Sequence, residues 1–246
     1  MPRSDERSTG SGLWAMPRFG IVAAMEREVG PFIRSAKTVQ RECEGRVFKF
    51  YERGNTVLVC GGIGTEAARR ATQAVIELYG AEIVQSVGYA GALTETLKVA
   101  DLITPSRVTD TRDGSSVQLE GRGVLITSNQ VASAEEKRSL AQAYSADAVD
   151  MEAAAVAKGA EARGVGFAVL KVISDDSDFE MPNMAPFINA EGQFQAHRFG
   201  MFALARPWLW GKLLTLSKNS RAATQKLCQA LEEQLASRVG QQVLPA

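Results

Sequence analysis

The chain has 246 residues, of which 45% are hydrophobic, and this is enough to bury one substantial core. Its 28 Lys and Arg residues balance 28 Asp and Glu residues, so the basic excess of a nucleic-acid-binding protein is absent and no nucleic-acid partner is expected. The three cysteines are widely spaced, which argues against a disulfide scaffold or a zinc site and predicts a reducing, cytoplasmic location.

The N-terminal stretch MPRSDERSTGSG is polar and lacks the apolar core of a signal peptide. No apolar run reaches the ~18 residues of a transmembrane helix. We therefore expect residues 1–17 to be a disordered leader, with Met16 as an alternative start, and residues 18–246 to form a single domain that ends in an extended aromatic helical segment.

Strand-like and helix-like segments alternate after the leader. Strands are predicted over residues 18–23, over 45–62 as two strands joined by a Gly-Asn turn, and over 81–93, 100–110, 115–119, 121–128 and 165–174. Helices are predicted over residues 24–36, 64–80, 133–146 and 148–160, with two more toward the C-terminus. The alternation predicts an α/β fold with a mostly parallel sheet covered on both faces, in which ligands bind at the carboxyl ends of the strands.

Acidic residues gather at three such strand ends or helix starts. They are Glu26 and Glu28, then Asp150 and Glu152, and then Asp175, Asp176 and Asp178. Two glycine-rich turns, residues 61–64 and 88–93, also stand at the ends of predicted strands. All these groups could therefore converge on one edge of the sheet, which we call the rim. A buried charge needs a partner or a function, so the rim is a candidate site.

Each of these features also has a purely structural interpretation. Glu28 could stabilise a helix N-terminus through the helix dipole, and Asp150 could be an N-cap with Glu152 in the first turn. Asp175 or Asp176 could cap the next element. The turn at 61–64 could be a simple strand-to-helix connection, since it lacks the lysine of a P-loop.

The order of these motifs resembles the nucleoside phosphorylase superfamily, and within it the 5′-methylthioadenosine/S-adenosylhomocysteine nucleosidases. The resemblance rests on GIVAAMEREV, GGIGTEAA, VGYAGAL with LKVADLITPSRV, VDMEAAAVA and VLKVISDDSD, and spans roughly residues 18–178. It implies a three-layer α/β/α sandwich around a central mixed, mostly parallel sheet. It also implies cleavage of an N-ribosidic bond, no cofactor and no metal, and a homodimer.

The resemblance also assigns roles to individual residues. Glu28 matches the carboxylate that activates the attacking water, and Asp175, preceded by Ser174, matches the aspartate that protonates the purine N7. Met151 matches the methionine that packs on the ribose, and Glu152 the glutamate that binds its hydroxyls. Further substrate contacts are expected from Gly64, Tyr89, Ala90, Gly91 and Val131.

Three departures from the family pattern bear on the reaction. Ser86 and Tyr89 stand where phosphorolytic relatives carry Arg and Ser, which favours water over phosphate as the nucleophile. Val131 and Ala132 stand in place of an aromatic residue that stacks on adenine, which weakens the case for adenine as the base. Lys171 replaces an arginine, which preserves the positive charge.

The C-terminal segment is longer and more aromatic than in these nucleosidases. Phe199, Phe202, Trp208, Trp210 and Leu213 either form a core or dimer helix or cap the 5′ side of the sugar, and the segment resembles a branch of the superfamily that removes adenine from adenosylhopane. Contact with a membrane surface is therefore possible. Besides hydrolysis of a 5′-substituted adenosine, a phosphorylase, such a lipid nucleosidase and a non-catalytic nucleoside-binding protein are the alternatives.

Overall fold

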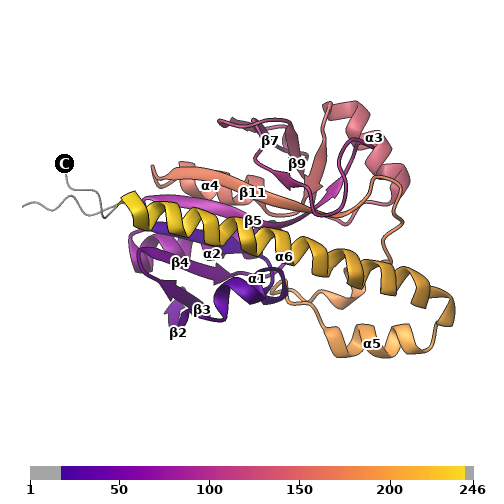
Figure 1. Ribbon diagram of the computed structural model, residues 1–246, viewed down its shortest axis with the longest axis horizontal. Coiled ribbons are helices and arrows are strands. Elements are labelled where there is room, and N and C mark those ends of the chain that lie inside the picture. The colour runs from indigo at the N-terminus through magenta and orange to yellow at the C-terminus, as the bar shows by residue number, and fades with distance from the viewer. Residues whose placement is uncertain (1–17, 242–246) are drawn as a thin grey trace, which may run out of the picture.

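The computed structural model describes residues 18–241 and shows an 11-stranded mixed sheet with helices on both faces (Figure 1). The strands are β1 (Phe19–Ala23), β2 (Lys37–Cys43), β3 (Arg46–Arg53), β4 (Thr56–Cys60), β5 (Ile83–Ala92), β6 (Leu102–Ile103), β7 (Arg107–Asp110), β8 (Ser116–Gln118), β9 (Val124–Thr127), β10 (Ala148–Asp150) and β11 (Gly166–Asp175). The helices are α1 (Glu26–Ile33), α2 (Thr65–Tyr79), α3 (Ala134–Tyr144), α4 (Ala153–Glu161), α5 (Ala196–Leu204) and α6 (Trp210–Gln241), with 3-10 turns η1 (Ala185–Phe187) and η2 (Pro207–Leu209). The predicted fold class is confirmed.

The sheet runs in the order β2-β3-β4-β1-β5-β10-β9-β7-β8, and β11 pairs with β5 and β6. The centre is parallel, since β1 pairs with β4 and β5, and β5 pairs with β11. The pairing of β1 with β5 ends at Val87, and β10 joins β5 in antiparallel fashion from Gly91. Along its other edge β5 is paired with β11 as far as Gly91. Among the described strands, residues 88–90 therefore have a partner on one edge only, and on the edge between the ends of β1 and β10 they face the site described below.

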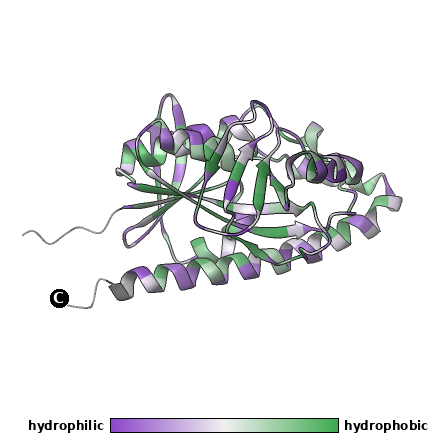
Figure 2. Ribbon diagram, turned by 90° about the horizontal axis from the view of Figure 1, so that it is seen from above, coloured by the Kyte–Doolittle hydropathy of each residue, from purple (hydrophilic) through white to green (hydrophobic). Residues whose placement is uncertain are grey.

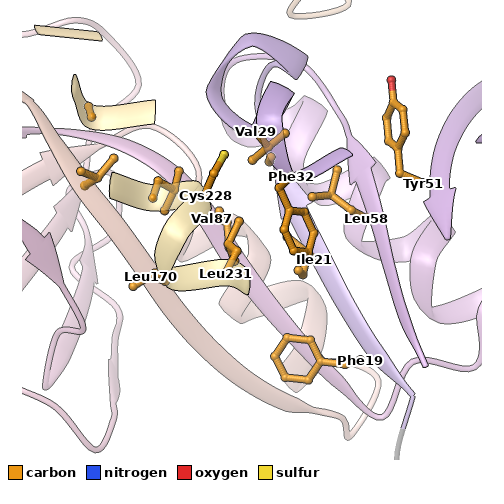
Figure 3. Packing of buried hydrophobic residues seen from close by; sticks show 14 residues of the cluster. Phe19, Ile21, Val29, Phe32, Tyr51, Leu58, Val87, Leu170, Cys228 and Leu231 are labelled. Atoms are coloured by element: carbon orange, nitrogen blue, oxygen red, sulfur yellow. The ribbon is translucent and has the colours of Figure 1, made fainter. Parts of the chain in front are cut away.

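Both faces of the central strands are buried. Since successive side chains of a strand point to opposite faces of the sheet, neighbouring residues enter two different cores. On β1, Ile21 faces a core shared with α1 and α6, whereas Val22 faces a core shared with α2 and α4. Figure 3 shows the first core, to which β1 contributes Ile21, α1 contributes Phe32 and α6 contributes Leu231. Burying each such large apolar side chain contributes about 1.5–3 kcal/mol.

We predicted one helix over the alanine-rich segment 148–160, and this prediction is wrong. The segment forms a strand followed by a helix. Residues 148–150 form β10 inside the sheet, and α4 begins at Ala153. A Cβ at Gly159 would lie 2.9 Å from Thr72 Cγ2 of α2, so small residues are required where the two helices meet. Burial between sheet partners overrides the high helix propensity of this stretch.

Two other boundaries differ from the prediction. The first helix ends at Ile33, and β2, which was not predicted, follows it as an edge strand paired with β3. Segment 100–110 splits into β6 and β7 because Pro105 separates them. The proposed leader, residues 1–17, lies outside the described residues.

The C-terminal part consists of α5 and the 32-residue α6. The second half of α6 packs on α1 and the sheet, whereas Figure 1 shows α5 and the first turns of α6 extending beyond the sheet. Figure 2 shows largely hydrophobic strands beside a helix α6 whose hydropathy changes repeatedly along its length. No helix among residues 18–241 is long and apolar enough to cross a membrane.

Candidate active site

A cavity of about 150 Å³ lies at the carboxyl ends of β1, β5 and β11. Its wall contains four carboxyl groups, from Glu28, Asp150, Glu152 and Asp175, which belong to the three acidic clusters of the sequence. The predicted residues Met151, Tyr89, Ala90, Gly91, Val131 and Ser174 line it as well, whereas Gly64 lies just behind the wall. The structure therefore brings together side chains that are up to 147 positions apart in the sequence, from Glu28 to Asp175.

Glu28 enters the cavity from the first turn of α1. Its side chain is buried, and its Oε2 has no hydrogen-bond partner among the described residues. Burial, together with the nearby charge of Glu152, raises the pKa of Glu28 to about 8, against the partial opposition of Lys171. A Cβ at Gly88 would lie 2.7 Å from Glu28 Oε2, so the backbone of β5 passes directly against this carboxyl group. Gly88 has a φ of 147°, which an L side chain rarely adopts.

Glu152 stands at the N-terminus of α4 but does not cap that helix. Its Oε1 accepts a hydrogen bond of 2.8 Å from the backbone N–H of Gly64, and its Oε2 accepts one of 3.3 Å from Met151 N–H. Burial and the neighbouring Asp150 raise the pKa of Glu152, while Lys171 lowers it. The turn at 61–64 is therefore more than a connection between β4 and α2, because it orients an acidic side chain of the cavity.

Asp150, and not Glu152, provides the side chain that accepts a backbone N–H at the start of α4. Its Oδ2 accepts a bond of 2.8 Å from Ala153 N–H and lies 2.8 Å from Lys171 Nζ, and its Oδ1 accepts a bond of 2.7 Å from Thr127 Oγ1. Lys171 is fully buried. Burial alone would lower its pKa, but Asp150 and Glu152 beside it raise the pKa above the usual range. Lys171 thus places a fixed positive charge beneath the acidic groups of the cavity.

Asp175, at the end of β11, is held by two donors. Ser174 Oγ donates to its Oδ1 over 2.6 Å, and Lys137 Nζ of α3 donates to its Oδ2 over 2.5 Å. Lys137 is itself buried and also donates to the backbone carbonyl of Asp176. Asp175 therefore does not cap a following element, which was the structural alternative for this residue.

The rest of the wall is largely apolar. Met181, Met184, Ile188 and Phe194 come from the segment between β11 and α5. The aromatic residues of the tail do not line the cavity, contrary to our interpretation that Trp208 and Trp210 could cap it: their side chains are 73% and 49% exposed. Phe199 instead packs edge-on against Phe187, and so supports this wall from behind.

Lys137 and the methionine and phenylalanine wall were not predicted from the sequence. Lys137 belongs to an ordinary amphipathic helix pattern, and only its burial to 2% exposure distinguishes it from the other lysines of the surface. Glu136, its neighbour, has the expected capping role with Ser133. The sequence pattern therefore predicts the helix, but it does not predict that the Lys137 side chain points into the protein.

The residues at the positions of the phosphate site of phosphorolytic relatives, and the cations of the wall, indicate whether the cavity could bind phosphate. Ser86 is fully buried and does not line the cavity, and the Tyr89 hydroxyl bonds to Thr224 Oγ1 at 2.6 Å on α6. The cations in the wall are Lys137, which is paired with Asp175, and the exposed Arg27, which lies over the Phe194 ring. Within the described part of the chain, no cluster of three His, Cys, Asp or Glu side chains could hold a metal ion.

The fold and this site place the chain in a known class. The family model of the phosphorylase superfamily matches residues 18–121 and 118–197, which together make up most of the chain. The protein belongs to the phosphorylase superfamily. All the cavity residues described above lie within the matched region.

Within this superfamily the chain is similar to several nucleosidases. It is 29% identical to the 5′-methylthioadenosine/S-adenosylhomocysteine nucleosidase of Staphylococcus epidermidis, over 63% of this chain and 85% of that protein. It is 26% identical to the aminodeoxyfutalosine nucleosidase of Helicobacter pylori, over 66% of this chain and 87% of that protein. The structure of S-adenosylhomocysteine nucleosidase from Streptococcus pyogenes, with 5-methylthiotubericidin bound, shares the fold at a TM-score of 0.66 and 18% identity, over 89% of this chain and 96% of that chain.

Proposed function

We propose that this protein is a purine nucleosidase that hydrolyses the N-ribosidic bond of a 5′-substituted adenosine and releases the base. The observation that carries the proposal is the convergence of Glu28, Glu152 and Asp175 on one cavity. The similarity to nucleosidases named for 5′-methylthioadenosine, S-adenosylhomocysteine and aminodeoxyfutalosine supports the same reaction class.

In the proposed reaction the bond between C1′ and the purine nitrogen breaks, and its electron pair leaves with the base. Lys137, whose ammonium donates to Asp175 over 2.5 Å, supplies a proton that Asp175 passes to N7 of the departing purine. Positive charge develops on the ribose, as in glycoside hydrolysis. Glu152 binds the ribose hydroxyls and stabilises that charge, while Met151 packs on the sugar.

Water completes the reaction by attacking C1′ and giving a proton to Glu28. The raised pKa of Glu28, to about 8, makes its carboxylate a strong proton acceptor once it is ionised. A phosphate dianion needs cations, and of the two that line the cavity Lys137 is paired with Asp175 and the exposed Arg27 lies over the Phe194 ring. This scarcity of free positive charge supports water rather than phosphate as the nucleophile.

The apolar wall supports a substituent with apolar surface at the 5′ position. Burying such a group gains about 25 cal/mol per Å² of surface removed from water. The free thiols at Cys43, Cys60 and Cys228 fit the proposed cytoplasmic location. A homodimer is part of the same proposal and follows from the resemblance alone.

The test is base release in phosphate-free buffer from methylthioadenosine, S-adenosylhomocysteine, inosine and futalosine, each repeated with added phosphate. We expect turnover of a 5′-substituted adenosine without phosphate, with the free sugar as the product. A strict requirement for phosphate and a sugar 1-phosphate product would identify a phosphorylase. Substrate binding without base release from any of these compounds would favour the non-catalytic alternative.

A further inference from the structure

The exposed apolar side chains of this protein are concentrated at one place. Seven large hydrophobic side chains are classed as exposed among the described residues, and five of them lie between positions 201 and 214. These five, which we call the tip residues, are Met201, Leu204, Trp208, Trp210 and Leu214, and their exposures run from 49% to 73%. Neither α5 nor η2 contains a buried residue. Apolar patches of this kind on a folded protein mark an interaction surface.

The longer segment that contains the tip residues, 192–231, is strongly cationic, although the whole chain has no net charge. Residues 192–231 contain six Lys or Arg residues and no Asp or Glu. These cations are Arg198, Arg206, Lys212, Lys218, Arg221 and Lys226. None of them forms an ion pair with a carboxylate within the described part of the chain, whereas Lys and Arg residues elsewhere in the fold form eleven such pairs.

The tip is anchored to the wall of the cavity. Phe187 contacts Phe199 and Phe202 of α5 at ring-centroid distances of 5.2 and 5.0 Å, and Phe194, which lines the cavity, contacts Phe199 at 5.4 Å. These contacts use the inner face of α5. The tip residues are therefore left outside the aromatic cluster, and Figure 1 shows α5 and the first turns of α6 beyond the edge of the sheet.

From these observations we infer that the tip docks on the surface of an anionic lipid bilayer. Trp, Leu and Met side chains surrounded by Lys and Arg, without acidic residues, form the side-chain set of an interfacial membrane-binding helix. The apolar side chains enter the boundary between head groups and acyl chains, and the long cationic side chains reach the anionic head groups. The cavity wall then lies next to the bilayer.

The charge also decides between a bilayer and a second copy of the chain. A two-fold symmetric contact through the tip would bring the cations of two tips, among them Arg206 and Lys212, face to face. Like charges juxtaposed in this way oppose association. An anionic surface attracts the same charges, so it is the partner that fits the whole patch.

Vesicle co-sedimentation of the full chain tests the inference without reference to activity. We expect binding to phosphatidylglycerol/phosphatidylcholine vesicles, a loss of binding at high salt, and a blue shift of tryptophan fluorescence on binding. The variant Leu204→Ser/Trp208→Ser/Leu214→Ser should lose binding. The variant Lys212→Gln/Lys218→Gln/Arg221→Gln should bind at least about ten-fold more weakly, since each cation near an anionic surface contributes roughly five-fold.

Two control variants match these changes elsewhere on the surface. Val47→Ser removes an exposed apolar side chain of β3, and Arg34→Gln/Lys98→Gln/Arg138→Gln removes three exposed cations outside the tip. Both should bind vesicles like the wild type. The inference is overturned if the wild type does not bind anionic vesicles, or if tip and control variants bind equally. It is also overturned if sedimentation velocity shows that the tip substitutions dissociate a dimer and leave vesicle binding intact.

Discussion

At the scale of single residues, the carboxyl groups to which we assign roles in the reaction differ in their hydrogen-bond partners. Glu28 Oε2 has no hydrogen-bond partner among the described residues, whereas Glu152 accepts two backbone N–H groups and Asp175 accepts bonds from Ser174 and Lys137. An unpaired buried carboxylate takes up a proton readily, and a carboxylate with an ammonium donor beside it has a proton close at hand. These differences agree with the roles that we propose for Glu28 as base and Asp175 as acid.

We expect Asp175→Asn to lower kcat by about a hundred-fold or more, because an amide cannot pass a proton to the leaving purine. Substrate-analogue binding should survive, since the side chain keeps its size and can still form hydrogen bonds. Steady-state kinetics and calorimetric titration of an analogue measure the two effects separately.

Asp178→Asn is the matched control, because Asp178 is exposed three positions further on and does not line the cavity. It should retain wild-type turnover. If Asp175→Asn turned over normally while Asp176→Asn was inactive, the assignment of the acid would be wrong by one residue.

At the scale of secondary-structure elements, a buried ion pair ties two strands and a helix together under the cavity. Lys171 of β11 pairs with Asp150 at the end of β10, and Asp150 accepts the N–H of Ala153 at the start of α4. Both side chains are buried, so neither charge can be compensated by water. The pair fixes the position from which Glu152 enters the site.

Lys171→Met should therefore destabilise the fold by about 3–5 kcal/mol, because it leaves the Asp150 carboxylate buried without its partner. Adding Asp150→Asn removes that charge and should restore a large part of the loss. Urea denaturation of both single variants and the double variant forms a cycle that measures the coupling. Additive losses, with no recovery in the double variant, would show that the pair is not coupled.

At the scale of the whole molecule, the active site is a source of instability. The pKa of Glu28 rises on folding from 4.5 to about 8, and burial also raises that of Glu152. The native state then binds more protons than the unfolded state between these values, so the free energy of unfolding falls as the pH increases across this range. The stabilisation by proton binding is complete below pH 4.5 and is lost as the pH passes through about 8.

Glu28→Gln should remove this dependence in part, because glutamine carries no charge to bury. We expect the variant to be more stable than the wild type at pH 9, by about 1–4 kcal/mol, and to differ little at pH 5. Thermal or urea unfolding at several pH values measures it, and the same variant should be inactive. A stability difference that was equal at pH 5 and pH 9 would contradict the raised pKa.

The sequence by itself determined the class of fold and the chemical character of the site. Alternating strand and helix patterns specify a sheet covered on both faces, because the periods of 2 and 3.6 residues are properties of the local chain. The motifs around Glu28, Glu152 and Asp175 placed acidic groups at strand ends. The parallel strands β1 and β11 bring Glu28 and Asp175 to the same edge, whereas Glu152 follows β10, which is antiparallel to β5. The capping box at Ser133 and the turn at Gly54 are likewise local, and the structure contains both.

Only the tertiary structure decided which side chains turn inward and what they meet. Segment 148–150 became a strand because sheet partners were available on both sides, and Lys137 became a buried partner of Asp175 because α3 packs beside the end of β11. The tail provides the clearest case, since its composition is compatible both with a wall of the cavity and with an exposed tip. The contacts of Phe187 with α5 determined the outcome, turning the phenylalanines inward and leaving Trp208 in solvent. Burial depends on neighbours far away in the sequence, and no local period encodes it.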